Sequence, residues 1–206
     1  MSARASAKDI VLASGSRARR EMLAAAGVPF TVRAADVDEP AIRARMYEID
    51  PNVDPKKVAA VLAAAKAEDV GGKQPGALVI GADQVLALGD ALLSKTPTID
   101  AARAALQKLR GKTHELHSGI AVVRGGALAF GHVAVARMTM RAFSESFLDA
   151  YLDAAGANVT ASVGAYQLER TGIHLFEKIE GDHFTILGLP LLPLLDYLRG
   201  EGSLAA

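Results

Sequence analysis

Residues 9–27 read DIVLASGSRARREMLAAAG, and they contain the clearest structural pattern of the chain. The segment from Asp9 to Ser14 is short and mostly apolar, which predicts a buried strand that passes directly into Ser14-Gly15-Ser16. Arg17 to Ala26 then has the apolar spacing of a helix, and Gly27 supplies a C-terminal stop. The stretch therefore predicts a strand, a loop and a helix in immediate succession.

Short strands alternate with helices and hairpins along the rest of the chain. Strands are expected at Phe30–Ala34, Ala77–Ala82 and Ile173–Ile179, helices at Pro55–Val70, Ala101–Arg110, Phe143–Ala155 and Leu189–Arg199, and hairpins at Leu86–Leu93 and Glu115–Met140. The strand from Ala77 is expected to end at Asp83, Asp36–Pro40 is interpreted as an acidic turn, and Asp100 as the cap of the next helix. This alternation predicts an α/β fold with a mixed β-sheet flanked by helices.

The composition is that of a globular protein, because half of the 206 residues are hydrophobic and 22% are charged. A chain of this length buries about 70% of its unfolded surface when it folds. Lys plus Arg and Asp plus Glu number 23 each, so no excess of positive charge is present and no nucleic-acid partner is expected. Cysteine is absent, which leaves oxygen or histidine as the only ligands for a metal.

No targeting or membrane segment is visible in the sequence. The apolar stretch Ile10–Ala13, which follows the basic residues Arg4 and Lys8, is too short for the core of a secretion signal. The longest apolar tract, Leu187–Leu195, is interrupted by glycine and proline and is far shorter than a membrane span of about 20 residues. We therefore expect a cytoplasmic protein without a membrane partner.

Ser14-Gly15-Ser16 is a candidate phosphate site. Backbone N–H groups, two hydroxyls and the positive end of the helix converge there. Arg19 projects near the same helix end and can bind phosphate oxygens through two N–H groups. The alternative is a serine N-cap beside solvated arginines, and the pattern alone favours that alternative because it is neither a Walker loop nor a dinucleotide fingerprint.

Two groups of carboxylates are candidates for chemistry. Asp83 follows an apolar run, and ligands of open α/β sheets collect beyond the carboxyl ends of the strands. In a functional role, Asp83 can ligate Mg²⁺ or accept a proton from attacking water. Alternatively it is a turn aspartate, and its position in the sequence does not distinguish the two interpretations. Asp36, Asp38 and Glu39 form either a solvated acidic loop, which the pattern alone favours, or a source of a second metal ligand.

Lysines and histidines indicate a functional site less clearly than the carboxylates do. Lys66 lies among alanines on the helix expected from Pro55, and Lys95 lies in the loop after the first hairpin, so each can be a simple surface charge. His114 and His117 are three residues apart in an extended segment, which places their side chains on opposite faces. No zinc site is expected there.

Taken together, these residues resemble the Maf family. The landmarks follow the family's order: Leu12-Ala13-Ser14-Gly15-Ser16 with Arg19 and Leu23, Asp38-Glu39, Lys66-Ala67, Gly81-Ala82-Asp83, Lys95, Gly164-Ala165-Tyr166 and Gly188-Leu189-Pro190-Leu191. The resemblance implies one domain over residues 1–206, with an elongated mixed β-sheet flanked by helices and two lobes around a central cleft, of the Maf and ITPase-like type. It also implies homodimers.

The resemblance further implies a nucleoside triphosphate pyrophosphatase, which cleaves between the α and β phosphates and uses Mg²⁺ or Mn²⁺. By matching positions, Ser14, Ser16 and Arg19 would bind phosphates, Glu39 and Asp83 would engage the metal or water, and Lys66 and Lys95 would offset the triphosphate charge. Asp83 matches the family's proton acceptor. Two departures weaken the lysine matches, because Ala65 replaces a common Glu before Lys66, and Thr96 separates Lys95 from Pro97.

Three further positions, Ala18, Gln84 and Glu169, distinguish subgroups by the same resemblance. Members that cleave dTTP and UTP would carry Arg, Thr and Gln there. Gln84 and Glu169 instead resemble the subgroup that acts on 7-methyl-GTP, where a carboxylate suits a guanine edge that offers N–H donors. Ala18 departs from that subgroup, which commonly has Trp at this position, and Glu169 alternatively pairs with Arg170 or a lysine.

A nucleotide-binding regulator is the competing function, because Maf proteins have been linked to septum formation and cell shape. Such a protein would bind a nucleotide without turnover. It would not need Asp83, Glu39, Lys66 and Lys95 together, so the sequence favours an enzyme.

Overall fold

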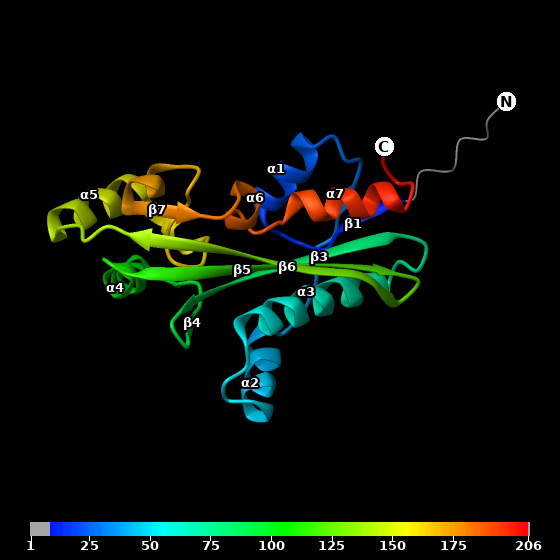
Figure 1. Cartoon of the computed structure of the whole chain (residues 1–206), viewed down its shortest axis with the longest axis horizontal. Coiled ribbons are helices and arrows are strands. Elements are labelled where there is room, and N and C mark those ends of the chain that lie inside the picture. The colour runs from blue at the N-terminus through cyan, green and yellow to red at the C-terminus, as the bar shows by residue number, and fades with distance from the viewer. Residues whose placement is uncertain (1–8, 206) are drawn as a thin grey trace. The chain divides into compact units, whose positions relative to one another are not determined.

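A computed structural model describes residues 9–205 of the chain (Figure 1). Its strands are β1 (Ile10–Leu12), β2 (Thr31–Val32), β3 (Leu78–Leu88), β4 (Ala91–Leu93), β5 (Thr113–Arg124), β6 (Ala127–Met140) and β7 (Phe176–Glu180). Its helices are α1 (Arg17–Ala25), α2 (Glu39–Ile49), α3 (Pro55–Gly71), α4 (Ile99–Leu109), α5 (Glu145–Ala155), α6 (His183–Ile186) and α7 (Leu191–Gly200), with 3₁₀ turns at Gly156–Thr160 and Thr171–Leu175. Arg4 and Lys8 lie outside the described residues. Within residues 9–205, no helix has both the length and the apolar character that a membrane crossing requires.

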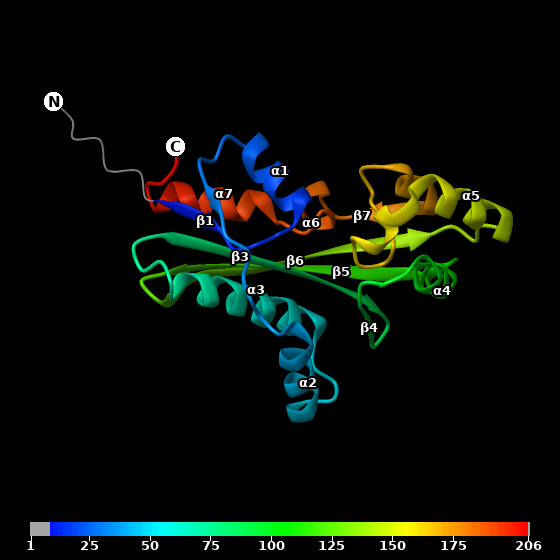
Figure 2. The same cartoon turned by 180° about the vertical axis from the view of Figure 1, so that it is seen from behind.

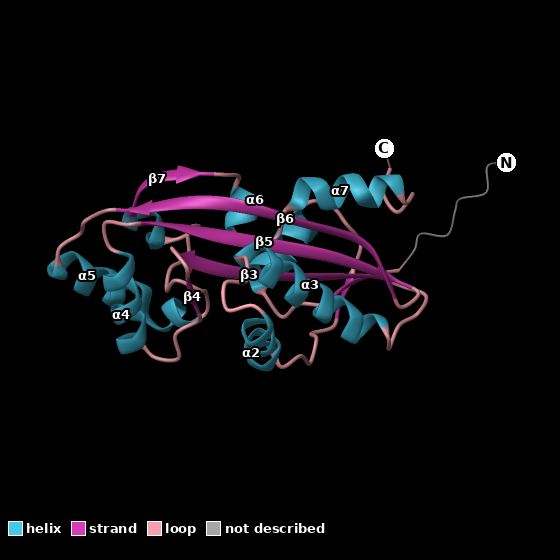
Figure 3. Ribbon diagram, turned by 60° about the horizontal axis from the view of Figure 1, so that its bottom comes forward, coloured by secondary structure: helices cyan, strands magenta, loops and turns pink. Residues whose placement is uncertain are grey.

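The seven strands form one mixed sheet in the order β2-β1-β3-β5-β6-β7, with β4 paired to β3. β1 runs parallel to β2 and β3, whereas β4 is antiparallel to β3, and β7 is antiparallel to β6. Figure 3 shows these strands as a layer with helices beside it. The predicted α/β fold with a mixed sheet flanked by helices is confirmed.

The chain divides into two compact units. The first takes in the described parts of Met1–Asp83, Ser118–Ala134 and Leu187–Ala206, and the second takes in Gln84–His117 and Val135–Ile186. Three strands, β3, β5 and β6, therefore contribute residues to both units. The expected single domain over residues 1–206, with two lobes around a cleft, stays a prediction.

In the first unit, α1 and α7 lie on one side of the strands and α3 lies on the other (Figures 1 and 2). α3 lies so close to the sheet that side chains are excluded at two points. A Cβ atom on Gly81 would lie 2.1 Å from the carbonyl oxygen of Ala63 and 2.7 Å from the backbone nitrogen of Ala67. A Cβ on Gly119 would lie 2.5 Å from the carbonyl oxygen of Ala59. Only glycine fits on the strands at these points, and the facing helix positions carry the smallest side chain, alanine.

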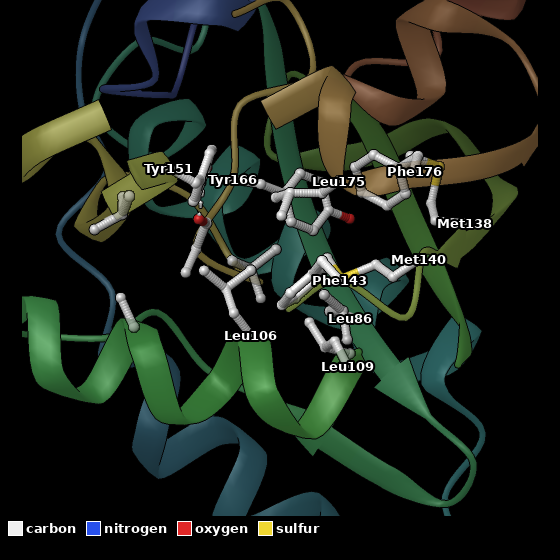
Figure 4. Packing of buried hydrophobic residues seen from close by; sticks show 14 of the residues in the cluster. Leu86, Leu106, Leu109, Met138, Met140, Phe143, Tyr151, Tyr166, Leu175 and Phe176 are labelled. Atoms are coloured by element: carbon white, nitrogen blue, oxygen red, sulfur yellow. Dashed lines mark hydrogen bonds between the residues drawn. The ribbon is translucent and has the colours of Figure 1, made fainter. Parts of the chain in front are cut away.

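The second unit has a core rich in aromatic side chains (Figure 4). The labelled side chains include Leu86 of β3, Leu106 and Leu109 of α4, Met138 and Met140 of β6, Tyr151 of α5, and also Phe143, Tyr166, Leu175 and Phe176. His114 of β5 is buried beside this core, with its ring centroid 5.7 Å from that of Tyr166 and 6.0 Å from that of Phe176. The core of the second unit therefore includes rings that carry polar groups, from tyrosine and histidine.

The expected end of a strand at Asp83 was wrong. β3 continues to Leu88, because its far end pairs with β4 from Leu86 to Leu88. β1, by contrast, stops early: its register with β3 ends at Leu12 opposite Ile80. Asp83 therefore lies in the middle of β3, beyond the part of the strand that β1 covers.

The prediction of an acidic turn at Asp36–Pro40 was also wrong, since Glu39 begins α2. Asp38 caps this helix by accepting a hydrogen bond of 2.9 Å from the backbone N–H of Ala41. Two smaller corrections concern other boundaries. Thr98, and not Asp100, caps α4, because its hydroxyl accepts from the N–H of Ala101. β7 begins at Phe176, because residues 171–175 form a 3₁₀ turn.

The close approach of α3 predicts the effect of Gly81→Ala. The added methyl group would overlap backbone atoms of α3, which cannot move aside without shifting the helix, so the free energy of unfolding should fall by about 3 kcal/mol. Urea denaturation measures the change. Gly76→Ala is the matched control, because a Cβ there meets nothing within 4 Å, and its change should stay within about 0.5 kcal/mol. Equal stability of both variants would contradict the close approach.

Burial of His114 predicts a dependence of stability on pH. Burial lowers the pKa of His114 to about 4, whereas a histidine in the unfolded chain titrates near 6.5. The neutral ring is favoured in the folded state, so its contribution is fully present above pH 6.5 and is lost as the pH falls toward 4. The difference between the two pKa values corresponds to about 3 kcal/mol.

Denaturation of the wild type and of His114→Gln between pH 7 and 4 checks this prediction. The free energy of unfolding should fall less steeply in the variant. His132→Gln, at an exposed position of β6, should leave the slope unchanged. Identical slopes in His114→Gln and the wild type would refute the role of His114.

Candidate active site

The loop between β1 and α1 is fixed by its two serines. The hydroxyl of Ser16 accepts a hydrogen bond of 3.4 Å from the N–H of Arg19, which makes Ser16 the N-cap of α1. The N–H of Ser16 donates to the hydroxyl of Ser14 at 3.3 Å, and Ser14 is buried. The N-cap that the pattern favoured is thus present, and it places both hydroxyls at the positive end of the helix.

Arg19 connects three segments of the first unit. Its Nε donates to the carbonyl oxygen of Gly188 at 2.8 Å, and its Nη1 donates to the carbonyl oxygen of Ala82 at 2.7 Å and to the hydroxyl of Ser14 at 3.2 Å. Burial lowers the pKa of the Arg19 guanidinium, while the charges of Asp83 and Glu39 oppose that shift. Because Nε and Nη1 already have acceptors, Nη2 is the nitrogen that could donate to an added anion.

Lys66 lies between two carboxylates. Its Nζ is 2.6 Å from Oδ1 of Asp83 and 2.7 Å from Oε1 of Glu39. The side chains of Lys66 and Asp83 are only 13% and 8% exposed, so Lys66 is not a simple surface charge. The three residues come from α3, β3 and the first turn of α2, and the contact at Gly81 sets the distance between α3 and β3.

Glu39 is the only acidic residue of its segment that reaches Lys66. Asp38 caps α2, and Asp36 is exposed, with its N–H donating to Oδ2 of Asp69 at 2.9 Å. Arg43, one helical turn after Glu39, places its Nη2 3.6 Å from Oε2 of Glu39. The sequence interpretation missed Arg43, because its spacing from Glu39 has meaning only on a helix, and α2 was not expected.

The remaining candidate residues are divided between the units. Ala18 is half-buried on α1 of the first unit, whereas Gln84, Lys95 and Glu169 belong to the second. Gln84 donates from Nε2 to the carbonyl oxygens of Thr185 and Ile186 at 3.1 and 3.0 Å. Lys95 is exposed and pairs through its backbone with Val163, next to Gly164-Ala165-Tyr166, and Glu169 is exposed.

Gly164-Ala165-Tyr166 forms a tight turn in the second unit. Ala165 has a φ of 60°, a left-handed conformation that costs a non-glycine residue energy unless its surroundings hold it. Three side chains supply that hold, and no sequence pattern pointed to this role. Tyr151 donates from its hydroxyl to the carbonyl oxygen of Ala165 at 3.1 Å, Ser162 donates to that of Tyr166 at 2.6 Å, and Nε2 of His114 lies 2.7 Å from the hydroxyl of Tyr166.

Comparison with known proteins identifies the family. The family model described as "Maf-like protein" matches residues 9–201. The chain belongs to the Maf family. The resemblance read from the sequence is thereby confirmed.

Three curated relatives of this Maf protein have names that state an activity. A "Nucleoside triphosphate pyrophosphatase" of Rhodopseudomonas palustris is 53% identical over 95% of each chain. One of Paramagnetospirillum magneticum, with the same name, is 52% identical over 94% of this chain and 99% of the relative. A "7-methyl-GTP pyrophosphatase" of Brucella abortus is 50% identical over 93% of this chain and 96% of the relative.

Proposed function

We propose that this Maf protein is a nucleoside triphosphate pyrophosphatase, a hydrolase that cleaves a nucleoside triphosphate into the monophosphate and pyrophosphate. The observation that carries the proposal is the position of Lys66 between Asp83 and Glu39. Relatives at about half identity that are named nucleoside triphosphate pyrophosphatases support it. The cytoplasmic location and the homodimer implied by the resemblance are parts of the same proposal.

The triphosphate would be bound by groups that already lie in the first unit. The N-terminus of α1 presents the hydroxyls of Ser14 and Ser16, and Arg19 retains its Nη2 donors. Lys66 adds a partly buried cation. Lys95, from the second unit, is the further cation that we assign to the phosphates.

A divalent cation, Mg²⁺ or Mn²⁺, fits the donors that the site provides. Carboxylate oxygens of Glu39 and Asp83 are hard ligands. Among residues 9–205, no group of three or more His, Cys, Asp or Glu side chains is arranged so that it could hold a metal ion by itself. Glu39 and Asp83 would therefore hold the ion together with phosphate oxygens and water, which is how proteins commonly bind Mg²⁺. When bound, the metal neutralises the charge that develops on the phosphates.

Asp83 is the group that we assign as the proton acceptor. It is buried in the middle of β3, and the hydrogen bond from Lys66 fixes its Oδ1. Its second oxygen, Oδ2, can accept a proton from a water molecule that attacks the phosphate. Arg19 holds the adjacent backbone through the carbonyl of Ala82, so it steadies Asp83 as well.

We further propose that the base is a guanine, and that 7-methyl-GTP is preferred to dTTP and UTP. Gln84 and Glu169 match the subgroup with that activity, and a relative at 50% identity is named for it. The exposed carboxylate of Glu169 can accept hydrogen bonds from the N–H groups of guanine. Ala18 offers no aromatic ring for stacking, so the preference should be modest.

A nucleotide panel tests this function directly. Purified protein should release pyrophosphate in the presence of Mg²⁺ or Mn²⁺ and lose this activity in EDTA, with a higher kcat/KM for 7-methyl-GTP than for dTTP or UTP. Glu169→Gln should lose the preference, because it removes a charge and keeps the size of the side chain. Glu177→Gln, at an exposed position of β7, is the control. Full activity in EDTA, or dTTP or UTP as the best substrate, would contradict the respective assignment.

Asp83→Asn tests the proton acceptor. The amide keeps the shape of the side chain but cannot take up the proton, so kcat should fall by about 10²- to 10⁴-fold while the protein stays folded. Pyrophosphate release and circular dichroism report on the two properties. Asp36→Asn, at an exposed position of the first unit, should retain normal turnover. Near-normal release by folded Asp83→Asn would remove Asp83 from the mechanism.

A further inference from the structure

Lys66 holds one oxygen of each carboxylate in the candidate site. Its Nζ lies 2.6 Å from Oδ1 of Asp83 and 2.7 Å from Oε1 of Glu39. The other carboxylate oxygen of Glu39, Oε2, lies 3.6 Å from Nη2 of Arg43. These four residues belong to the first unit. The ammonium of Lys66 therefore lies where an oxygen from β3 and an oxygen from α2 converge.

A divalent cation and this ammonium need the same two oxygens. Glu39 and Asp83 are the residues that we assign to the metal, and Oε2 of Glu39 faces the positive charge of Arg43, which leaves Oε1 as the better ligand. Mg²⁺ binds its oxygen ligands at about 2.1 Å, closer than the ammonium does. Two carboxylates cannot neutralise a divalent ion and an ammonium that both lie between them. Lys66 therefore competes with the metal for Oδ1 and Oε1.

Displacement of Lys66 is costly unless another anion accepts it. Its side chain is mostly buried, and a buried charge without a partner is strongly unfavourable. Asp69, three residues further along α3, already accepts from Lys73 at 2.6 Å and from the N–H of Asp36 at 2.9 Å. Glu68 lies two residues from Lys66, and a spacing of two places side chains on different faces of a helix. The two acidic residues that follow Lys66 on its own helix therefore offer it no ready partner.

Phosphate oxygens can supply that partner. In the proposed function a triphosphate is bound by Ser14, Ser16 and Arg19, which belong to the same unit as Lys66. Arg19 donates to the carbonyl oxygen of the residue before Asp83, so the phosphates would lie beside the strand that carries this carboxylate. A triphosphate therefore brings both further oxygen ligands for a divalent cation and a new partner for the ammonium.

We propose that Lys66 occupies, in the protein without nucleotide, the place between Asp83 and Glu39 that the divalent cation takes when the nucleotide is bound. The cation then binds tightly only together with a triphosphate, which accepts the displaced ammonium. This inference rests on the proposed function and adds a coupling to it, because two ligands that favour each other do so by the same factor. The exchange takes place at Oδ1, so Oδ2 of Asp83 stays available as the proton acceptor in both states.

Binding of Mn²⁺ in the absence of nucleotide tests the competition, and electron paramagnetic resonance of the free ion measures it. Lys66→Met removes the ammonium and keeps an unbranched side chain, so the affinity for Mn²⁺ should rise by about tenfold. Lys57→Met removes the same charge from an exposed position of α3 and should leave the affinity unchanged. Lys66→Met combined with Glu39→Gln should lose the gain, because the released carboxylate is then absent. Circular dichroism checks that each variant is folded.

The same titration with α,β-methylene GTP, in which a methylene group replaces the oxygen between the α and β phosphorus atoms, measures the coupling. The analogue should raise the affinity of the wild type for Mn²⁺ by about tenfold or more, after subtraction of the ion that the analogue binds by itself. In Lys66→Met the analogue should raise the affinity less, by the factor that the variant has already gained without nucleotide. The ammonium no longer has to be displaced there.

An unchanged affinity for Mn²⁺ in folded Lys66→Met would overturn the inference. A wild type that binds Mn²⁺ as tightly without the analogue as with it would also overturn the inference, and this comparison does not depend on the folding of a variant. Absence of pyrophosphate release from every nucleotide would instead overturn the proposed function. The titration with Mn²⁺ alone involves neither nucleotide nor turnover, so it reports on Lys66 in that case as well.

Discussion

The contact between α3 and β3 at Gly81 is the constraint on which the candidate site depends. At this point the helix backbone lies where a side chain of β3 would otherwise be. Side chains alternate along a strand, so Asp83, two residues after Gly81, faces the same helix. Lys66 adjoins Ala67, one of the residues that contact Gly81, and its chain is long enough to reach the carboxylate. The absence of a side chain at residue 81 thus brings the two charges together.

The charges gathered around Asp83 nearly balance one another. Asp83 and Glu39 supply two negative charges, Lys66 and Arg19 supply two positive ones, and Arg43 lies at the edge beside Glu39. Burying charges in this way is tolerable only when each has a partner, because an unpaired buried charge is costly. A chain with 23 basic and 23 acidic residues can therefore still bring several cations together in one place. The cations are concentrated locally, and the net charge of the whole chain carries no information about them.

Sequence patterns predicted the elements that have an apolar run, an apolar face or a glycine turn. β1 is buried throughout, α1 and α3 each bury one face, and Gly125-Gly126 marks the turn between β5 and β6, and the positions of these elements agree with the structure. α2 was missed because none of its residues is buried, so it has no apolar periodicity to detect. β3 was cut short because Asp83 and Gln84 interrupt its apolar run, and its continuation depends on pairing with β4. The partners of Arg19 were invisible for a related reason: they are carbonyls 63 and 169 residues away, and every residue has one.

The segment from Thr185 to Gly188 accepts hydrogen bonds from two of the candidate residues. It offers three carbonyl oxygens, of which the last accepts from Arg19, and the first two accept from Gln84. Arg19 also donates to the carbonyl oxygen of Ala82, which precedes Asp83 in β3. Gln84 follows Asp83 in the same strand. Gly188 has a φ of 89°, a conformation that glycine adopts readily and other residues rarely adopt. A side chain at residue 188 would therefore strain the backbone that presents its carbonyl to Arg19, and the glycine of this motif is explained by that geometry without any contact to the nucleotide.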